Sequence, residues 1–506
     1  AMIKVYAIMG IGLMNRNYLW FILFVILSPV LHAAESAVFS DIIEINESGH
    51  KVKYKRVKEP SQDAIDNSQA EVGEDMDIKA FKNSYISPYN YTQDPIAYNM
   101  GTSSVAGPNG TYHVGLSQIS TTNINLNSQN AARFDETVEA WGQTQRWGGF
   151  ALGGALQSGV IMEQTGQPNT YGTTGIIFPT QAYADWEYKD AFEITGGNIL
   201  LTTPWVNSIS SFPGATYANQ NNTFQGVTAN LQVMPNLLLT GFRVFSYLQF
   251  PDNGFSSTTL YNTMGGPLQN MGSTSTPGAT GAGATWNPSS NYTLNAWFYQ
   301  FYDYADMWYA DNNYHLPLST ATSFDFGVQA LTQNANGSSI PANTLAPGSS
   351  TQNLGGVSGN AVGMKFAVNV GHNTVTLAYN NVFGANGSYL NGGIVTPYTF
   401  GLETDPLYTT PALNSIAELG SGSAYLIKDS MSFLDNSLKA SLAFSQFFVN
   451  QVYATQANQI TEYDAALQYT IPNTTLNFWS RLVYVSQPDY AGGSFLQPRL
   501  IVNYTF

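Results

Sequence analysis

From residue 83 onward, apolar and polar residues alternate along the chain with a period of two. Tyr463, Ala465 and Leu467 share one face of a predicted strand, whereas Asp464 and Gln468 share the other. Successive side chains of a β-strand point to opposite faces, so this alternation predicts strands rather than helices. The same pattern recurs at residues 185–189, 324–329, 365–379, 438–444 and 476–484.

The segments between these predicted strands fall into two length classes. Tight turns such as residues 371–373 alternate with long tracts rich in Gly, Ser, Asn, Thr and Pro, at 251–292, 333–360 and 384–423. Short turns on one side and long loops on the other are typical of a transmembrane antiparallel β-barrel. At about 9 to 11 residues per spanning strand, we expect about 16 to 20 strands, with 18 preferred, and long extracellular loops that fold partly into the lumen.

Composition supports a membrane barrel. Charged residues make up only 10% of the chain, where a soluble domain carries about 25%. Residues 83–506 hold 31 charged residues in 424 positions, and aromatic residues reach 13% of the whole chain. Contact of one face of each strand with lipid explains the scarcity of charged residues. Aromatic girdles at the two lipid interfaces explain the high aromatic content.

The first 82 residues differ from this body. An apolar run at 18–31 follows Arg16 and precedes Ala33, and it is too short for a spanning helix, which predicts a signal peptide over residues 1–33. Within it, residues 1–13 read as an artefact of the assigned start site. Residues 34–82 carry 18 charged residues in 49 positions and are predicted to be a periplasmic or disordered extension. The barrel is expected over residues 83–506.

The last strand carries an assembly signal. Phe506, Tyr504, Val502 and Leu500 share one face of the closing sequence RLIVNYTF. This arrangement resembles the C-terminal strand that the barrel assembly machinery of bacterial outer membranes recognises. It predicts a Gram-negative outer-membrane location, with outer-membrane lipid, lipopolysaccharide and that machinery as partners.

Several other functions are excluded or disfavoured. A net charge of −15 opposes binding to nucleic acid, and the absence of Cys removes disulfides, thiolate metal sites and Cys nucleophiles. Of the histidines, His113 and Ser117 share parity but lie about 13 Å apart along a strand, too far for a catalytic pair. We therefore expect no enzyme activity, no cofactor and no metal site.

Several sequence blocks, in order, resemble the OprD-like family of substrate-selective outer-membrane porins. They are Glu193–Ser208, Asn222–Val244, Tyr304–Leu316, Glu462–Val485 and Pro498–Phe506. The resemblance implies an 18-stranded barrel with a narrow eyelet and inward-folded loops. It also implies a ladder of basic side chains that guides the carboxylate of amino acids or small organic acids.

Two arginines match that ladder best, Arg481 and Arg499, and parity also places Lys365 and Lys439 on the lumen face. A guanidinium offers a fixed fork of donors to a carboxylate, and several in file let an anion pass between sites. The predicted acidic wall consists of Asp464, Glu462, Asp325, Asp185 and Glu187. The competing interpretation is that these charges pair with one another as a structural lining.

The chain also departs from the family. Residues 206–222 correspond to a part of the family's constriction that usually carries a basic residue, yet they contain no Arg or Lys. A neutral or cationic solute is therefore an alternative to an anion. The sequence predicts a monomeric or trimeric porin for passive diffusion of small hydrophilic solutes. The alternative is a surface-exposed barrel whose loops at 251–292 and 333–360 act as an adhesin or bind a ligand.

Overall fold

The fold is known for most of the chain beyond residue 104. The computed structural model describes residues 105–505 apart from 108–109, 126–130, 166–175, 190, 202, 209–221, 249–253, 258, 260–274, 338–354, 400–404, 435, 451–457, 475 and 488–492. Contacts divide the chain into units 1–77 and 78–506, and all described residues belong to the second. The predicted signal peptide and extension, and Phe506, lie outside the described residues.

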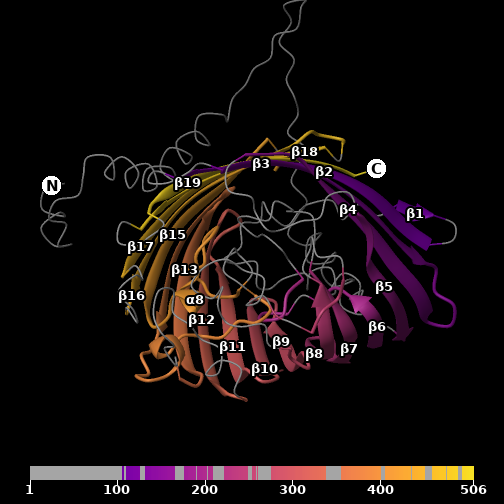
Figure 1. Ribbon diagram of the computed structural model, residues 1–506, viewed down its shortest axis with the longest axis horizontal. Coiled ribbons are helices and arrows are strands. Elements are labelled where there is room, and N and C mark those ends of the chain that lie inside the picture. Colours follow the sequence, from indigo (N-terminus) through magenta and orange to yellow (C-terminus); the bar gives the residue numbers. More distant parts are fainter. Residues whose placement is uncertain are drawn as a thin grey trace, which may run out of the picture. The chain divides into compact units, whose positions relative to one another are not determined.

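One antiparallel sheet contains all the strands of the described part (Figure 1). The strands are β1 Val105–Gly107, β2 Gly110–Asn125, β3 Ala131–Thr144, β4 Phe150–Thr165, β5 Ile176–Tyr188, β6 Phe192–Ile199, β7 Thr223–Met234, β8 Leu237–Leu248, β9 Ala279–Ser289, β10 Tyr292–Phe301, β11 Ala305–Pro317, β12 Thr322–Ala335, β13 Ser358–Val370, β14 Asn373–Val382, β15 Gly422–Phe433, β16 Leu438–Val449, β17 Gln459–Thr470, β18 Asn477–Ser486 and β19 Phe495–Thr505. Two short helices, η2 at Tyr389–Asn391 and α8 at Ile416–Leu419, lie between β14 and β15.

The strand pairing returns to its starting point. From β2 to β19 each strand pairs with the next, and β19 pairs back with β2 from Gly115 to Asn125, while the short β1 pairs with the start of β2. The predicted antiparallel β-barrel is thereby confirmed. No helix in the described part of the chain is long and apolar enough to cross a membrane.

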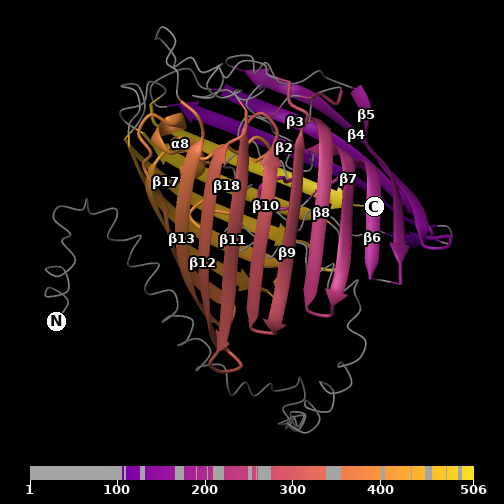
Figure 2. The ribbon, with the colours of Figure 1, turned by 90° about the horizontal axis from the view of Figure 1, so that it is seen from below.

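The connections sort onto two rims, seen from the side in Figure 2. One rim carries the turns after β3, β5, β7, β9, β11, β13, β15 and β17, none longer than the segment 471–476; we call it the short-turn rim. The other carries the connections 200–222, 249–278, 336–357 and 383–421 and is called the long-loop rim. In outer-membrane barrels the short turns are periplasmic, so the long-loop rim is the extracellular one.

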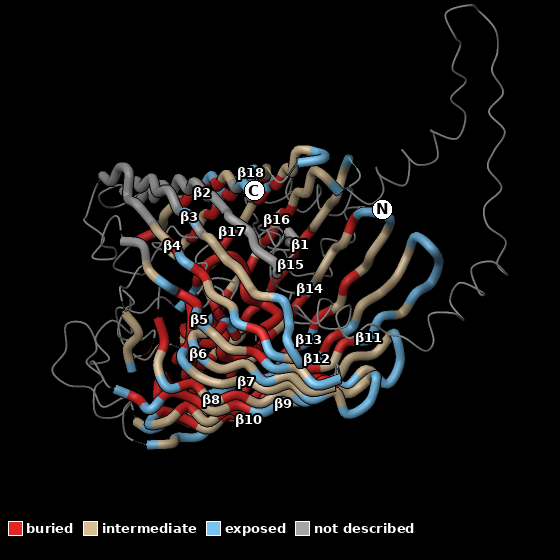
Figure 3. Tube along the Cα trace, turned by 90° about the vertical axis from the view of Figure 1, so that its right-hand side faces the viewer, coloured by how far each residue is buried: buried red, intermediate tan, exposed pale blue. Residues whose placement is uncertain are grey.

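Burial alternates along the strands as the period-two pattern predicts (Figure 3). On β18, Trp479 and Arg481 are buried, whereas Phe478 and Leu482 are 37% and 44% exposed. The exposed face is the outer one, because the buried face of many strands contacts one and the same loop. That loop comprises residues 383–421 and is called the inward loop.

Candidate functional site: the inner wall of the barrel

Two carboxylates on β17 hold the inward loop by its backbone. Glu462 accepts hydrogen bonds from the amide nitrogens of Leu413 at 2.7 Å and Asn414 at 3.0 Å, and from the Asn414 side chain. Asp464 accepts one from the amide of Ala412 at 3.2 Å. Both acids were predicted to line the pore. Glu462 is fully buried, and its carboxylate holds the loop through these hydrogen bonds.

Amide side chains of other strands hold the same loop from different directions. Gln333 on β12 exchanges two hydrogen bonds with the backbone of Val395, at 2.8 and 2.7 Å. Asn380 on β14 accepts from the amide nitrogen of Thr409 at 3.0 Å and from its hydroxyl at 3.1 Å. Anchors on β12, β14 and β17 hold the loop against the inner wall of the barrel.

The inner face of β7–β11 is rich in rings and is called the aromatic wall. Its buried rings belong to Phe224, Phe242, Tyr247, Trp297, Tyr299, Phe301 and Tyr309. Glycines make room for two of them: a Cβ on Gly281 would lie 2.3 Å from the Phe242 ring, and one on Gly283 would lie 2.2 Å from the Trp297 ring. Tyr398 of the inward loop packs edge-to-face on Phe224 and Tyr247. This wall is therefore covered by protein.

The inner face of β15–β19 carries cations and is called the basic wall. Arg481 and Arg499 occupy paired positions on β18 and β19, and Ala466 and Ser441 continue the same row on β17 and β16. Small residues beside the arginines leave room for long side chains. Lys428 on β15 and Lys439 on β16 complete the wall.

The two arginine side chains contact neighbouring residues of their own strands. The Arg481 guanidinium carbon is 4.6 Å from the centre of the Trp479 ring, and Arg499 Nε donates to Gln497 Oε1 at 3.0 Å. Their exposed fractions are only 2% and 6%. Ala466 is two residues closer to the short-turn rim than Asp464, so the arginine row follows directly below the anchored loop.

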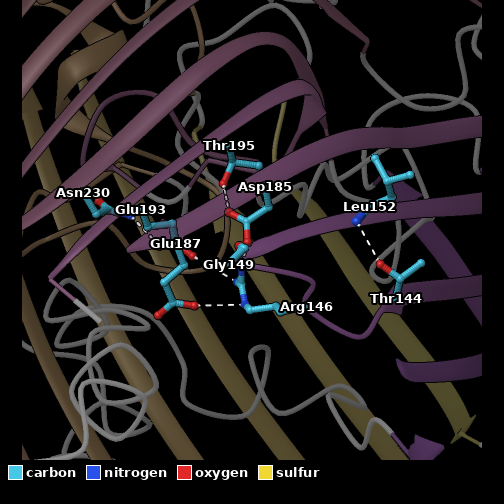
Figure 4. Close-up of polar contacts among 9 residues, drawn as sticks. All are labelled: Thr144, Arg146, Gly149, Leu152, Asp185, Glu187, Glu193, Thr195 and Asn230. Carbon is cyan, nitrogen blue, oxygen red and sulfur yellow. Dashed lines mark hydrogen bonds and ion pairs between the residues drawn. The ribbon is translucent and has the colours of Figure 1, made fainter. Parts of the chain in front are cut away.

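A cluster of carboxylates surrounds one arginine at the short-turn rim (Figure 4). Arg146, in the turn after β3, forms an ion pair with Asp185 and another with Glu187, at 3.0 Å, while Glu193 lies 3.9 Å away. Thr195 donates to Asp185 at 2.8 Å. Asp185 and Glu187, both predicted for the acidic wall, are thus held in a network with a cation.

Two remaining predicted lining residues have their own partners. Lys365 on β13 is 5% exposed, and its Nζ lies 4.8 Å from the centre of the Tyr408 ring in the inward loop. Asp325 on β12 contacts His315 Nδ1 at 2.6 Å and accepts from Asn369 at 2.6 Å, near the short-turn rim. Both side chains are therefore in contact with other groups of the protein.

The predicted assembly signal lies on the outer face where it is described. Tyr504 is 37% exposed and Leu500 50% exposed, and Val502 between them is intermediate. This is the face that the alternation in the last strand predicts. Their role in assembly stays a prediction.

Lys428, Arg146 and Glu193 were missed by the sequence reasoning. Lys428 follows a Gly- and Ser-rich stretch that obscures the start of β15, although its parity with Ala424 and Leu426 was available. Arg146 lies in a turn, where parity says nothing. Arg499 on β19 pairs with Thr121 on β2, and Thr121 pairs with Arg133 on β3. No local sequence pattern predicts such a relation across three strands.

The inward loop contains a buried acid, Asp405. Its carboxylate accepts from the amide of Leu407 at 3.0 Å and the hydroxyl of Thr410 at 2.8 Å, and it is 1% exposed. Burial raises the pKa of Asp405 to about 6, against the lowering effect of these hydrogen bonds. The charge state of the loop therefore changes in mildly acidic solution.

Within the described ranges, no group of three or more His, Asp or Glu residues is placed to bind a metal ion. The inner wall offers hydrogen-bond donors, cations and a fixed loop.

Comparison with known proteins agrees with the barrel. Residues 194–405 match the sequence model described as outer membrane porin, OprD family. The match includes the blocks Asn222–Val244 and Tyr304–Leu316 and leaves the two C-terminal blocks outside. No curated protein is significantly similar to the chain in sequence.

Solved porins share the fold at low identity. A BenF-like porin from Pseudomonas fluorescens Pf-5 superposes with a TM-score of 0.63 at 13% identity, covering 78% of this chain and 98% of its own. Pseudomonas aeruginosa OpdK with vanillate gives 0.60 at 14%, with the same two coverages. Pseudomonas aeruginosa OccD3 (OpdP) gives 0.58 at 15%, covering 80% and 92%.

The family match also bears on enzyme activity and location. Its members are channel porins and not enzymes, which confirms both the prediction of no enzyme activity and the outer-membrane location. The resemblance found in the sequence is confirmed, and the protein is an outer-membrane β-barrel porin related to the OprD family.

Proposed function

We propose that small hydrophilic anions, such as organic acids and amino acids through their carboxylates, diffuse passively along the basic wall beneath the inward loop. The observation that carries this proposal is the row of Arg481 and Arg499 in register on β18 and β19. Each guanidinium can offer forked donors to a carboxylate. Lys428 and Lys439 extend the positive face toward β15.

The inward loop forms the constriction in this proposal. Its anchors on three parts of the wall hold it at fixed distance from the arginines, so a solute that passes the loop meets the arginine row next. The loop packs on the aromatic wall, and its helix α8 also contacts β14, β15 and β16, so the arginine row below the loop is the part of the inner wall along which solute moves. OpdK, one of the structural neighbours, was solved with vanillate, which is a carboxylate.

Several weak sites in file suit passage better than one strong site, because a deep well would retain the solute. Arg481 is partly satisfied by the Trp479 ring and Arg499 by Gln497, which tempers the affinity of each for an anion. The acids Glu462 and Asp464 oppose this wall less than their number suggests, since loop amides surround them.

Planar-bilayer recording tests the proposal. Wild type is expected to form steady channels that prefer anions, and the double variant Arg481→Ala, Arg499→Ala is expected to lose that preference by several-fold. Lys189→Gln, an exposed cation in the turn after β5, is the matched charge control and keeps wild-type selectivity. Unchanged selectivity in the double variant contradicts the anion path, and absence of any channel in wild type contradicts the porin itself.

A further inference from the structure

One cation of the barrel faces away from the lumen. Residues 83–506 contain nine Lys and Arg residues. Among those whose side chains are described, five lie on the inner face and two in short turns, whereas Arg243 on β8 lies on the outer face. Its neighbours in β8, Phe242 and Val244, are buried against the lumen side, and Leu239, of the same parity as Arg243, is 38% exposed.

The strand is bent at this position by a β-bulge. The pairing of β7 with β8 shifts between Gln225 and Gly226, which leaves Phe245 as the extra residue on β8. A Cβ on Gly226 would lie 2.3 Å from the Arg243 carbonyl oxygen, so the close approach requires glycine. Bulges redirect side chains, and this one leaves Phe245 53% exposed beside Arg243.

The guanidinium is held by rings and carbonyls. Its central carbon lies 4.7 Å from the centre of the Phe245 ring and 4.6 Å from that of Tyr302, in the turn after β10. It donates to the carbonyl oxygens of Pro277 at 2.7 Å and Ala279 at 3.2 Å, and to that of Val244. These bonds use three of the five N–H groups of an arginine, so two donors remain for a ligand.

No carboxylate forms an ion pair with Arg243 among the described residues, whose ion pairs involve Arg146 and His315. Its positive charge therefore lacks a protein counter-ion in that part of the chain. A fixed, stacked guanidinium with spare donors is well suited to phosphate oxygens.

The position along the strand identifies the leaflet. β8 starts from the short turn at 235–236, and Arg243 lies toward its far end, beside the start of β9 and the turn at 302–304. That end belongs to the long-loop, extracellular rim, where the headgroups of the outer leaflet lie. A charged side chain near a bilayer interface costs only about 0–1 kcal/mol, so the outward placement is tolerated.

We propose that Arg243, with the rings of Phe245 and Tyr302, binds a phosphate group of outer-leaflet lipopolysaccharide on the outside of the barrel. The lipid A phosphate accepts from the two remaining N–H groups, and the exposed apolar face around Leu239 contacts the acyl chains. The solute path inside the barrel takes no part in this contact. Basic side chains at membrane surfaces recognise anionic headgroups in this way.

The test is binding of lipid A to the purified full-length protein in detergent, measured by native mass spectrometry. Wild type is expected to bind phosphorylated lipid A about tenfold more tightly than dephosphorylated lipid A with the same acyl chains, since a hydrogen-bonded charge is lost. This comparison needs no variant. Equal binding of the two lipids overturns the proposal.

Variants locate the site. Arg243→Gln is expected to lose most of the tenfold preference, and Arg243→Lys to keep part of it, because a lysine preserves the charge but not the fork. Lys189→Gln is the matched control, since Lys189 is also an exposed cation beside a ring, 5.1 Å from the centre of Tyr188, at the opposite rim. A preference retained in Arg243→Gln, or lost equally in Lys189→Gln, overturns the assignment to Arg243.

Channel measurements separate this proposal from that of the solute path. Arg243→Gln is expected to keep the conductance and ion selectivity of wild type, with the heat-modifiable mobility of a folded barrel on gels. A change of selectivity in this variant contradicts the outer-face assignment.

Discussion

The aromatic wall and the basic wall are built from the same strand alternation, yet they differ in what covers them. On β7–β11 the inward positions hold rings and the inward loop packs against them, as Tyr398 does on Phe224. On β15–β19 the inward positions hold Lys428, Lys439, Arg481 and Arg499 beside small residues, and also buried apolar residues toward the long-loop rim such as Phe447. Burial of apolar area stabilises the first contact, whereas desolvation of cations opposes the second.

This difference shows how the two walls hold the inward loop by different kinds of contact. The inward loop is held by apolar packing, which also includes Phe447 and Val449 of β16, and by carboxylates on β17. If solute moves as proposed, stability depends mainly on the aromatic wall and ion selectivity on the basic wall.

The largest effect is expected from Trp205, which lies after β6, is fully buried and packs edge-to-face on Tyr309 of the aromatic wall. Trp205→Ala should lower the free energy of unfolding by about 3–5 kcal/mol, measured in urea, through the cavity it leaves. Ion selectivity should not change. Trp308→Ala, on the outer face of β11 and 61% exposed, is the control and should cost about 1 kcal/mol. Equal losses of unfolding free energy in the two variants would contradict the view that packing on the aromatic wall stabilises the fold more than the outer face does.

Glu462→Ala should release the inward loop from β17. Two backbone amides and one side-chain amide lose their acceptor, a cost of about 3 kcal/mol. Single-channel conductance should rise and become noisier. Asp464→Ala, which removes the acceptor of the Ala412 amide, should have a smaller effect. A wild-type conductance in Glu462→Ala would show that the loop does not depend on this anchor.

The pH dependence of the loop follows from Asp405. Because burial raises its pKa to about 6, the folded loop binds a proton more tightly than the unfolded chain. Stability of the loop is therefore highest below about pH 4 and falls as the pH rises to about 6, by an amount on the order of 2–3 kcal/mol. Loop-opening events in single-channel records should be rarer at pH 4 than at pH 7. Asp405→Asn should remove this difference, and a persistent one would implicate another group.

The smallest effect is expected at the short-turn rim. His315 is about half exposed and contacts Asp325 at 2.6 Å, so His315→Gln should change the free energy of unfolding by less than about 1 kcal/mol. Urea titration at pH 6 and pH 8 measures it. A loss as large as that of Trp205→Ala would mean that the rim contributes to stability as the aromatic wall does.

The barrel could be predicted from the sequence because strand alternation is a local property. Positions such as Arg481 and Leu482 take opposite faces whatever their neighbours are, and the lengths of turns and loops are written directly in the chain. The inward placement of Lys365, Lys439, Arg481 and Arg499 followed from that parity, as did the outer face of Leu500 and Tyr504.

Partners could not be predicted, because they come from distant parts of the chain. Glu462 meets amides 48 and 49 residues away, and Arg146 meets carboxylates of two later strands. Parity places a carboxylate on the inner face but does not say whether a loop amide, an arginine or water will satisfy it. The sequence alone thus determined a membrane barrel with most of its strand charges turned inward. The tertiary structure decided which charges anchor the loop and which pair with one another, since that depends on packing between residues far apart in sequence.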